Sequence, residues 1–136
     1  MSFSAVNGGR LEKQYTTRLQ QVTIRNKTRG TLLGDAIGRA DTSSARNVGL
    51  LKHTGLKPGE GLWIIPTEAV HTFFMKFAID VLFLDRQRRV LKAVPRLRPW
   101  RLAGSWRART VLELPPGTIE ATGTRRGDEL EVTSNG

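Results

Sequence analysis

The chain has 136 residues, the length of about one domain, and its 38% apolar content is enough for one modest core. It contains no cysteine, which excludes disulfides and thiolate metal sites and fits a reducing compartment. The formal net charge is +10, from 22 Lys and Arg against 12 Asp and Glu, which favours anionic partners. We find no apolar run typical of a secretory signal or a membrane span, so we expect a cytoplasmic protein without a membrane partner.

The first elements along the chain predict an arm followed by a hairpin. Residues 1–18 are polar and contain glycine without a lasting apolar period, so we expect a loose N-terminal arm. The rest, 19–133, is expected to form a single β-rich domain. Apolar segments at 22–25 and 31–37, separated by turn-forming residues, predict the opening hairpin of that domain.

The next stretch predicts a short helix and two strands. Thr42 or Ser43 can cap a helix with apolar residues at helical spacing, and Gly55 can close it. Residues 62–65 are apolar and end at a proline, as expected of a strand. Alternation over 71–77 predicts another strand, whose aromatic and methionine side chains either pack in the core, which we favour, or line a ligand cavity.

The remaining elements are mostly strands. Residues 79–84 are apolar on both faces except for one carboxylate, which predicts a covered interior strand, and 90–94 is its expected hairpin partner. Further strands are expected at 111–114 and 128–132, with one helical turn over 118–121. This spacing predicts a mainly β fold: an antiparallel β-sandwich or a barrel-like, jelly-roll type sheet with one or two short helices.

Three ordered blocks carry a resemblance to a known family. They are GLLKHTGLKPGEGLWII from Gly49, HTFFMKFAIDVLFLD from His71 and VLELPPGTIEATGTRRGD from Val111. Together they resemble the domain of unknown function 192 family of bacterial and archaeal proteins, over roughly 22–132. The resemblance implies a compact β-rich domain of jelly-roll or sandwich type. The family has no established activity, so the resemblance implies no catalytic residues.

Polar residues in and beside these blocks are candidates for a pocket. They are Arg46, Glu60, His71, Lys76 and Asp80. Asp80 lies in an otherwise apolar strand, where an unpaired carboxylate is costly to bury, so we expect Lys76 or Arg46 to meet it. Two interpretations stay open: His71 or Asp80 exchanges protons while Arg46 holds an anionic substrate, or a buried ion pair fixes the strand register.

Other site types find little support in the sequence. His53 and His71 lie far apart, and no short-spaced set of metal ligands accompanies them. No serine has the flanking glycines of a nucleophile elbow, and the short Gly-Glu-Gly segment at 59–61 is no phosphate-binding loop. We therefore expect no metal and no cofactor, and the sequence leaves open whether the protein is an enzyme, favouring a binding protein.

Nine cations and no carboxylate lie between positions 86 and 109. Arginines neutralise phosphates and an exposed indole can stack on a base, so this stretch predicts a surface for nucleic acid or for an acidic protein. The alternative is a solvated basic face whose tryptophans cap the core. The candidates for anion binding are Arg96, Arg98, Trp100, Arg101, Trp106, Arg107 and Arg109.

Overall fold

The computed structural model describes residues 19–50 and 53–135, so the expected arm over 1–18 lies outside the described residues. The strands are β1 (Gln21–Asn26), β2 (Thr31–Ala40), β3 (Glu60–Ile64), β4 (Ala69–His71), β5 (Ile79–Leu84), β6 (Val90–Leu97), β7 (Leu102–Gly104), β8 (Thr110–Leu114) and β9 (Leu130–Ser134). The helices are α2 (Ser43–Val48) and α3 (Thr118–Thr122). Within the described chain, neither helix has the length needed to cross a bilayer.

Seven strands form one mixed sheet in the order β6-β5-β8-β3-β2-β1-β9, and β4 and β7 form a separate ribbon. The mainly β fold and the short helices are as predicted. The expectation of purely antiparallel pairing is wrong, because β2 and β3 run parallel, with Ile37 opposite Gly61. The segment between them contains α2, and a connection of this length allows the chain to enter β3 in the same direction as β2.

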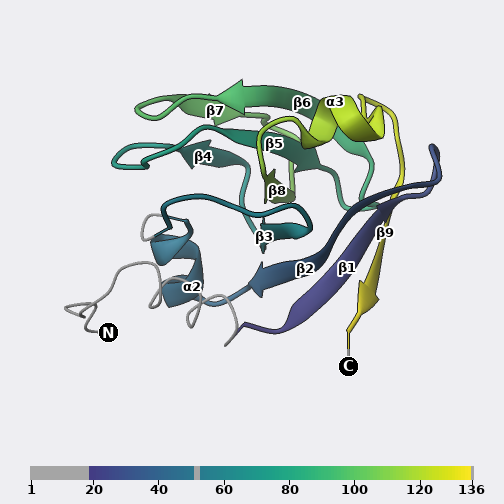
Figure 1. Ribbon diagram of the computed structural model, residues 1–136, viewed down its shortest axis with the longest axis horizontal. Helices are drawn as coiled ribbons and strands as arrows, with labels where there is room; N and C mark the ends of the chain where they lie inside the picture. Colours follow the sequence, from purple (N-terminus) through teal and green to yellow (C-terminus); the bar gives the residue numbers. More distant parts are fainter. Residues whose placement is uncertain (1–18, 51–52, 136) are drawn as a thin grey trace.

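The large sheet curls until its two edge strands meet at one end (Figure 1). Arg89 next to β6 and Glu129 next to β9 form an antiparallel bridge. The N–H of Val90 donates to the carbonyl of Asp128 at 2.9 Å, and the N–H of Leu130 donates to the carbonyl of Arg88 at 3.0 Å. These bonds close the sheet at that end only, so the architecture is a half-barrel.

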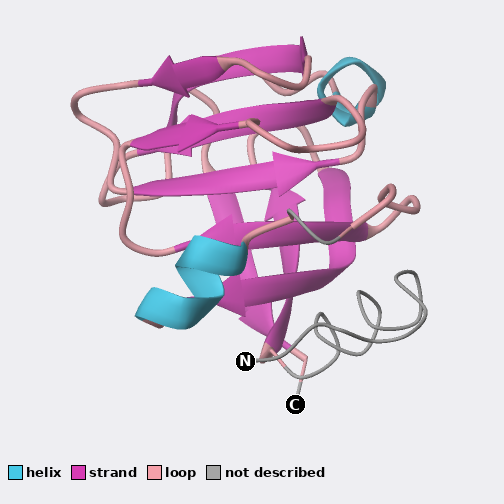
Figure 2. Ribbon diagram, turned by 90° about the vertical axis from the view of Figure 1, so that its left-hand side faces the viewer, coloured by secondary structure: helices cyan, strands magenta, loops and turns pink. Residues whose placement is uncertain are grey.

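The two faces of the sheet carry two apolar clusters, and β5 contributes to both. Leu82 and Leu84 belong to one cluster, whereas Val81 and Phe83 belong to the other. All six residues of β5 are buried, as the predicted interior strand requires. The helix α3 contributes Ile119 to the first cluster, while α2 and the β4–β7 ribbon contribute to the second. Figure 2 shows the two helices at opposite corners of the stacked strands.

Two local predictions are wrong, and one strand was not predicted. The helix α2 ends at Val48 rather than near Gly55, because Gly49, at φ 49°, turns the chain while its N–H bonds to the carbonyl of Ala45. The strand expected over 71–77 does not form, because β4 ends at His71 and turns and bends follow it. Its partner β7 was not predicted, since it has only three residues and little apolar alternation.

Candidate functional site

A pocket of about 310 Å³ opens between α2, the ribbon strand β4 and the large sheet. Its wall combines apolar side chains with a few polar groups that converge on one space, as in most small-molecule sites. The lining residues are Arg46, Gly49, Leu50, Ile64, Pro66, Thr67, Ala69, Val70, His71, Met75 and Glu113.

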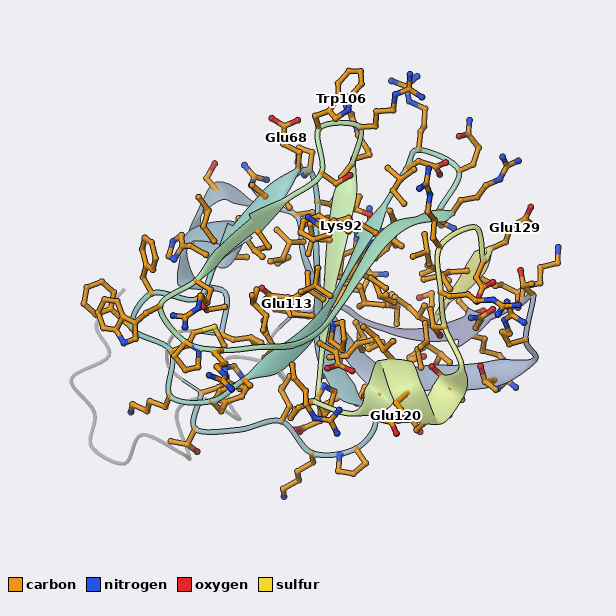
Figure 3. The ribbon with its side chains drawn as sticks, turned by 90° about the horizontal axis from the view of Figure 1, so that it is seen from above. Glu68, Lys92, Trp106, Glu113, Glu120 and Glu129 are labelled. Atoms are coloured by element: carbon orange, nitrogen blue, oxygen red, sulfur yellow. The ribbon has the colours of Figure 1, made fainter. Side chains whose placement is uncertain are left out.

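Glu113 is the most unusual group in this wall. It lies on the interior strand β8, opposite Leu62 of β3 and Val81 of β5, and only 4% of it is exposed. Figure 3 shows it in the middle of the molecule, where the strands cross. Within the described residues no hydrogen bond or ion pair reaches its carboxyl group. Burial raises the pKa of Glu113 from 4.5 to about 8, so the neutral form predominates at pH 7.

Arg46 enters the pocket wall from α2. Thr42 caps this helix, since its Oγ1 accepts a hydrogen bond of 3.1 Å from the N–H of Ala45. Arg46 Nη1 donates to the carbonyl of Ile65 at 3.0 Å, which ties the helix to the loop after β3. Nη1 also donates to the carbonyl of Asp41 at 3.3 Å and Nη2 to Ser43 Oγ at 3.4 Å, whereas the Nε–H has no partner among the described residues.

His71 and Met75 form the side of the pocket next to the ribbon. His71 ends β4 and is exposed, and its ring lies 5.1 Å from that of Phe73. Met75 is buried in the second apolar cluster and also lines the pocket. The pocket therefore has a histidine at its edge and an apolar wall deeper inside.

Asp80 does not meet a cation, contrary to the sequence-based expectation. Its Oδ1 accepts a hydrogen bond of 2.8 Å from the N–H of Arg96. Its Oδ2 accepts from the N–H groups of Gly117 at 3.1 Å and Ile119 at 2.8 Å. Three backbone donors stabilise the carboxylate as a counter-charge would. Asp80 thus anchors β6 and α3 and does not line the pocket.

Glu60 and Lys76 also lie outside the pocket lining. Glu60 accepts a hydrogen bond of 2.7 Å from the N–H of Lys57 and so closes the loop before β3. Its charge also acts on buried His53: burial lowers the pKa of that imidazole, and Glu60 partly opposes this. Lys76 is exposed in the turn after β4. Of the five sequence candidates, the structure brings only Arg46 and His71 to the pocket.

Sequence reasoning missed Glu113, although a signal was present. A lone carboxylate inside the apolar segment VLEL is as unusual as the lone carboxylate that drew attention to Asp80. The two buried carboxyl groups differ in their hydrogen-bond partners. Asp80 is buried with three backbone donors, whereas Glu113 is buried beside a pocket and has no partner in the part of the chain that the structure describes.

Metal ligands do not gather at this pocket. His71 and Glu113 are the lining residues with side chains that commonly bind metals. Across the described chain, no group of three or more His, Asp or Glu is arranged to hold an ion.

Most of the basic stretch falls into two groups at opposite ends of β6, and Lys92 and Arg96 lie within that strand. All nine cations are exposed. The β5–β6 turn carries Arg86, and the later part of the stretch returns to it, because the N–H of Arg109 donates to the carbonyl of Leu84 at 2.7 Å. Arg98 and Arg101 lie beyond the other end of β6. Among the residues that the structure describes, two of the nine cations have carboxylate partners: Arg89 pairs with Glu129, and Arg96 pairs with Glu120.

Trp100 and Trp106 do not cap the core, and they do not form one platform. They are 56% and 81% exposed. Trp100 precedes β7 and contacts Phe73 and Phe74, whereas Trp106 follows β7, and the guanidinium of Arg107 lies over its ring at 5.0 Å. The short ribbon separates them, and Figure 3 shows Trp106 beside Glu68 at the edge of the molecule.

The chain is similar to proteins whose function is not established. It is 35% identical to a UPF0127 protein of Thermococcus sibiricus, over 78% of this chain and 71% of that protein. Two crystal structures share its fold. One, of a protein of unknown function from Novosphingobium aromaticivorans, has a TM-score of 0.67 with 24% identity and covers 81% of this chain and 82% of that chain. The other, of a protein described provisionally as a transcription regulator from Sinorhizobium meliloti, has a TM-score of 0.69 with 21% identity and covers 83% and 92%.

The family profile spans nearly the whole described sheet. It matches residues 24–132, which include the pocket wall from α2 to β8. The chain therefore belongs to the domain of unknown function 192 family, DUF192, described as Uncharacterized ACR, COG1430.

Proposed function

We propose that this protein binds a small organic anion in the pocket between α2, β4 and β8. The observation that carries the proposal is Glu113, a carboxyl group on an interior strand that is 4% exposed and unpaired among the described residues. Burial of an unpaired carboxyl group costs free energy and does not stabilise the fold, which supports a role toward a ligand.

The neutral carboxyl of Glu113 and the cation of Arg46 have complementary roles in this proposal. With a pKa of about 8, Glu113 can donate a hydrogen bond to an acceptor on the ligand, and it can exchange a proton near neutral pH. Arg46 supplies the positive charge, because part of its guanidinium remains unbonded. Together they favour a ligand with one anionic group and one hydrogen-bond acceptor. His71 can add a polar contact at the edge.

The proposal replaces Asp80 with Glu113 as the proton-exchanging group. The sequence suggested a small-molecule or hydrolytic pocket around His71 and Asp80. The three backbone bonds to Asp80 support a structural role for it, so the pocket keeps His71 but relies on Glu113. We propose binding, since no serine, lysine or tyrosine lines the pocket among the described residues.

A panel of small carboxylates and phosphate monoesters, screened by thermal unfolding, tests this proposal. A bound anion raises the unfolding temperature with concentration, because it binds only the folded state. We expect this effect to be lost in Arg46→Gln and kept in the control Arg125→Gln, which removes an exposed charge outside the pocket. Affinity should also fall as the pH rises past the pKa of Glu113, about 8, and Glu113→Gln should remove that dependence. If the anion raises the unfolding temperature of Arg46→Gln as much as that of the wild type, and if Glu113→Gln keeps the pH dependence, the proposal is contradicted.

We propose as a second candidate that the basic group near the β5–β6 turn binds nucleic acid or an acidic protein. The supporting observation is Arg107 stacked on the exposed ring of Trp106, close to the exposed Arg86 and Arg109. The likeness to the Sinorhizobium meliloti structure supports the fold alone. Titration into labelled single-stranded RNA at physiological salt should show binding that Arg86→Glu with Arg107→Glu abolishes. Binding only at low salt would reject a dedicated surface.

A further inference from the structure

Four large apolar side chains are exposed together at one end of the β4–β7 ribbon. We name them the aromatic tip: Phe73, Phe74, Trp100 and Leu102, exposed by 39%, 69%, 56% and 72%. The ring of Trp100 lies 6.0 Å from that of Phe73 and 4.7 Å from that of Phe74. Leu102 stands opposite His71 in the ribbon. In Figure 1 the loops after β4 and before β7 project side by side from the same end of the molecule.

The backbone holds the tip in place. Thr72 is fully buried and joins the two loops: its N–H donates to the carbonyl of Arg101 at 2.8 Å, and its carbonyl accepts from the N–H of Trp100 at 2.9 Å. Its Oγ1 accepts from the N–H of Arg101 at 2.8 Å. Phe74 and Trp100 have φ values of 68° and 63°, which bulky residues rarely adopt. The exposed positions of these two rings therefore come with backbone strain at Phe74 and Trp100.

The two loops that carry the tip also carry positive charge. Lys76, Arg98 and Arg101 are exposed in the same two loops. Neither 72–78 nor 97–105 contains an aspartate or glutamate. Within the described residues, these three cations form no ion pair. An apolar tip with a rim of unpaired cations is complementary to a surface that is apolar inside and anionic outside.

We propose that the aromatic tip inserts into the surface of an anionic lipid bilayer. Trp, Phe and Leu partition into the boundary between headgroups and acyl chains, while Lys and Arg contact the anionic headgroups. Two stiff loops that project together suit insertion better than a flat protein interface. The proposal goes beyond ligand binding in the pocket and differs from the absence of a membrane partner expected from the sequence. That expectation considered only spanning segments, whereas insertion of loops needs none.

Other occupants fit the tip less well. The rings of Phe73 and Phe74 already contact that of Trp100, and Leu102 has no ring, so the tip is not a row of separate rings on which successive bases could stack. A second copy of the chain would place its own cations against Lys76, Arg98 and Arg101, which repels. A bilayer accommodates both the aliphatic side chain and the three charges.

Vesicles of phosphatidylcholine alone, and of equal parts phosphatidylcholine and phosphatidylserine, test the proposal with the full chain. We expect cosedimentation and a blue shift of tryptophan fluorescence only with the anionic vesicles. The shift should disappear in Trp100→Phe and persist in the control Trp106→Phe, because Trp106 lies at the other end of the ribbon. Each cation near an anionic surface contributes a factor of about five in binding, so Arg98→Gln with Arg101→Gln should weaken it about 25-fold. The matched pair Arg86→Gln with Arg107→Gln should weaken it far less.

Several outcomes would overturn this assignment. The absence of cosedimentation of the wild type with anionic vesicles would do so. A blue shift that is lost in Trp106→Phe and kept in Trp100→Phe would do so as well. Single-stranded DNA that quenches Trp100, while vesicles leave its emission unchanged, would assign the tip to nucleic acid instead. Phe74→Ala with Leu102→Ala separates insertion from charge, because both side chains are exposed and their loss should leave the urea unfolding midpoint nearly unchanged. If this variant binds anionic vesicles as tightly as the wild type, the tip does not insert.

Discussion

The carboxylate of Asp80 in β5 accepts a hydrogen bond of 2.8 Å from the backbone N–H of Ile119 in α3. Ile119 in turn packs into the apolar cluster that β5 lines with Leu82 and Leu84. A helix of five residues cannot stabilise itself in water, so its position depends on this bond and on that packing. Asp80 therefore acts as the attachment point of α3 on the sheet.

Asp80→Asn should destabilise the protein without altering the pocket. The amide keeps one acceptor oxygen but turns an NH₂ group toward a backbone donor, so at least one charged hydrogen bond is lost. We expect the free energy of unfolding to fall by about 3 kcal/mol, measured by urea denaturation. Asp35→Asn, at an exposed carboxylate, should change it by less than about 0.5 kcal/mol. Equal effects of the two substitutions would contradict the anchoring role.

Glu113→Gln should remove a pH dependence of stability. The folded-state pKa of about 8 lies above the ordinary value of 4.5, so the neutral form contributes its stability below 4.5. That contribution is lost as the pH rises toward 8, by up to about 1.4 kcal/mol per pH unit. Urea unfolding of both proteins across this range should show that the free energy of unfolding of the variant rises relative to that of the wild type as the pH rises. If the free energies of unfolding of the two proteins change with pH in parallel, ionisation of Glu113 does not destabilise the folded state.

The sequence predicts buried strands better than it predicts this site. The segment 79–84 is apolar on both faces, and only an interior strand satisfies that pattern, so β5 was predicted with the correct bounds. The alternation over 71–77 was misleading, because the buried hydrogen bonds of Thr72 turn the chain there and expose Phe73 and Phe74. Hydrogen bonds between segments far apart in the chain do not change the periodicity of apolar residues in the sequence, so this pattern could not reveal them. The roles of Asp80 and Glu113 likewise depend on which backbone donors the fold brings near each carboxylate.

Asp128→Asn should weaken the fold at neutral pH and less so in acid. Asp128 is 2% exposed and accepts from Asn26 Nδ2 at 2.9 Å and Arg29 Nε at 3.1 Å. Burial alone would raise the pKa of Asp128, but these bonds and the guanidinium charge lower it overall. Its stabilisation is therefore present above the ordinary value of 3.8 and is lost as the pH falls through the lower folded pKa.

Urea unfolding at a series of pH values checks this prediction. We expect the variant to lose about 2 kcal/mol at pH 7 and to converge with the wild type in strong acid. Glu129→Gln is the control, because its pair with Arg89 is about half exposed on both sides and should contribute less than about 1 kcal/mol. A deficit that stays constant with pH would show that packing, not charge, explains the role of Asp128.

Gly61→Ala should disturb the strand that carries Glu113. A Cβ at Gly61 would lie 2.7 Å from the backbone carbonyl oxygen of Glu113 and 3.1 Å from Leu114 Cδ2, so β3 and β8 must move apart. We expect the free energy of unfolding to fall by about 2 kcal/mol, as overpacking usually costs. We also expect the pKa of Glu113, followed by carboxyl NMR, to move down from about 8 as the strands separate and water gains access. Gly55→Ala is the matched control, since its Cβ would meet nothing within 4 Å. If both substitutions leave stability and this pKa unchanged, close contact between β3 and β8 is not what keeps Glu113 dry.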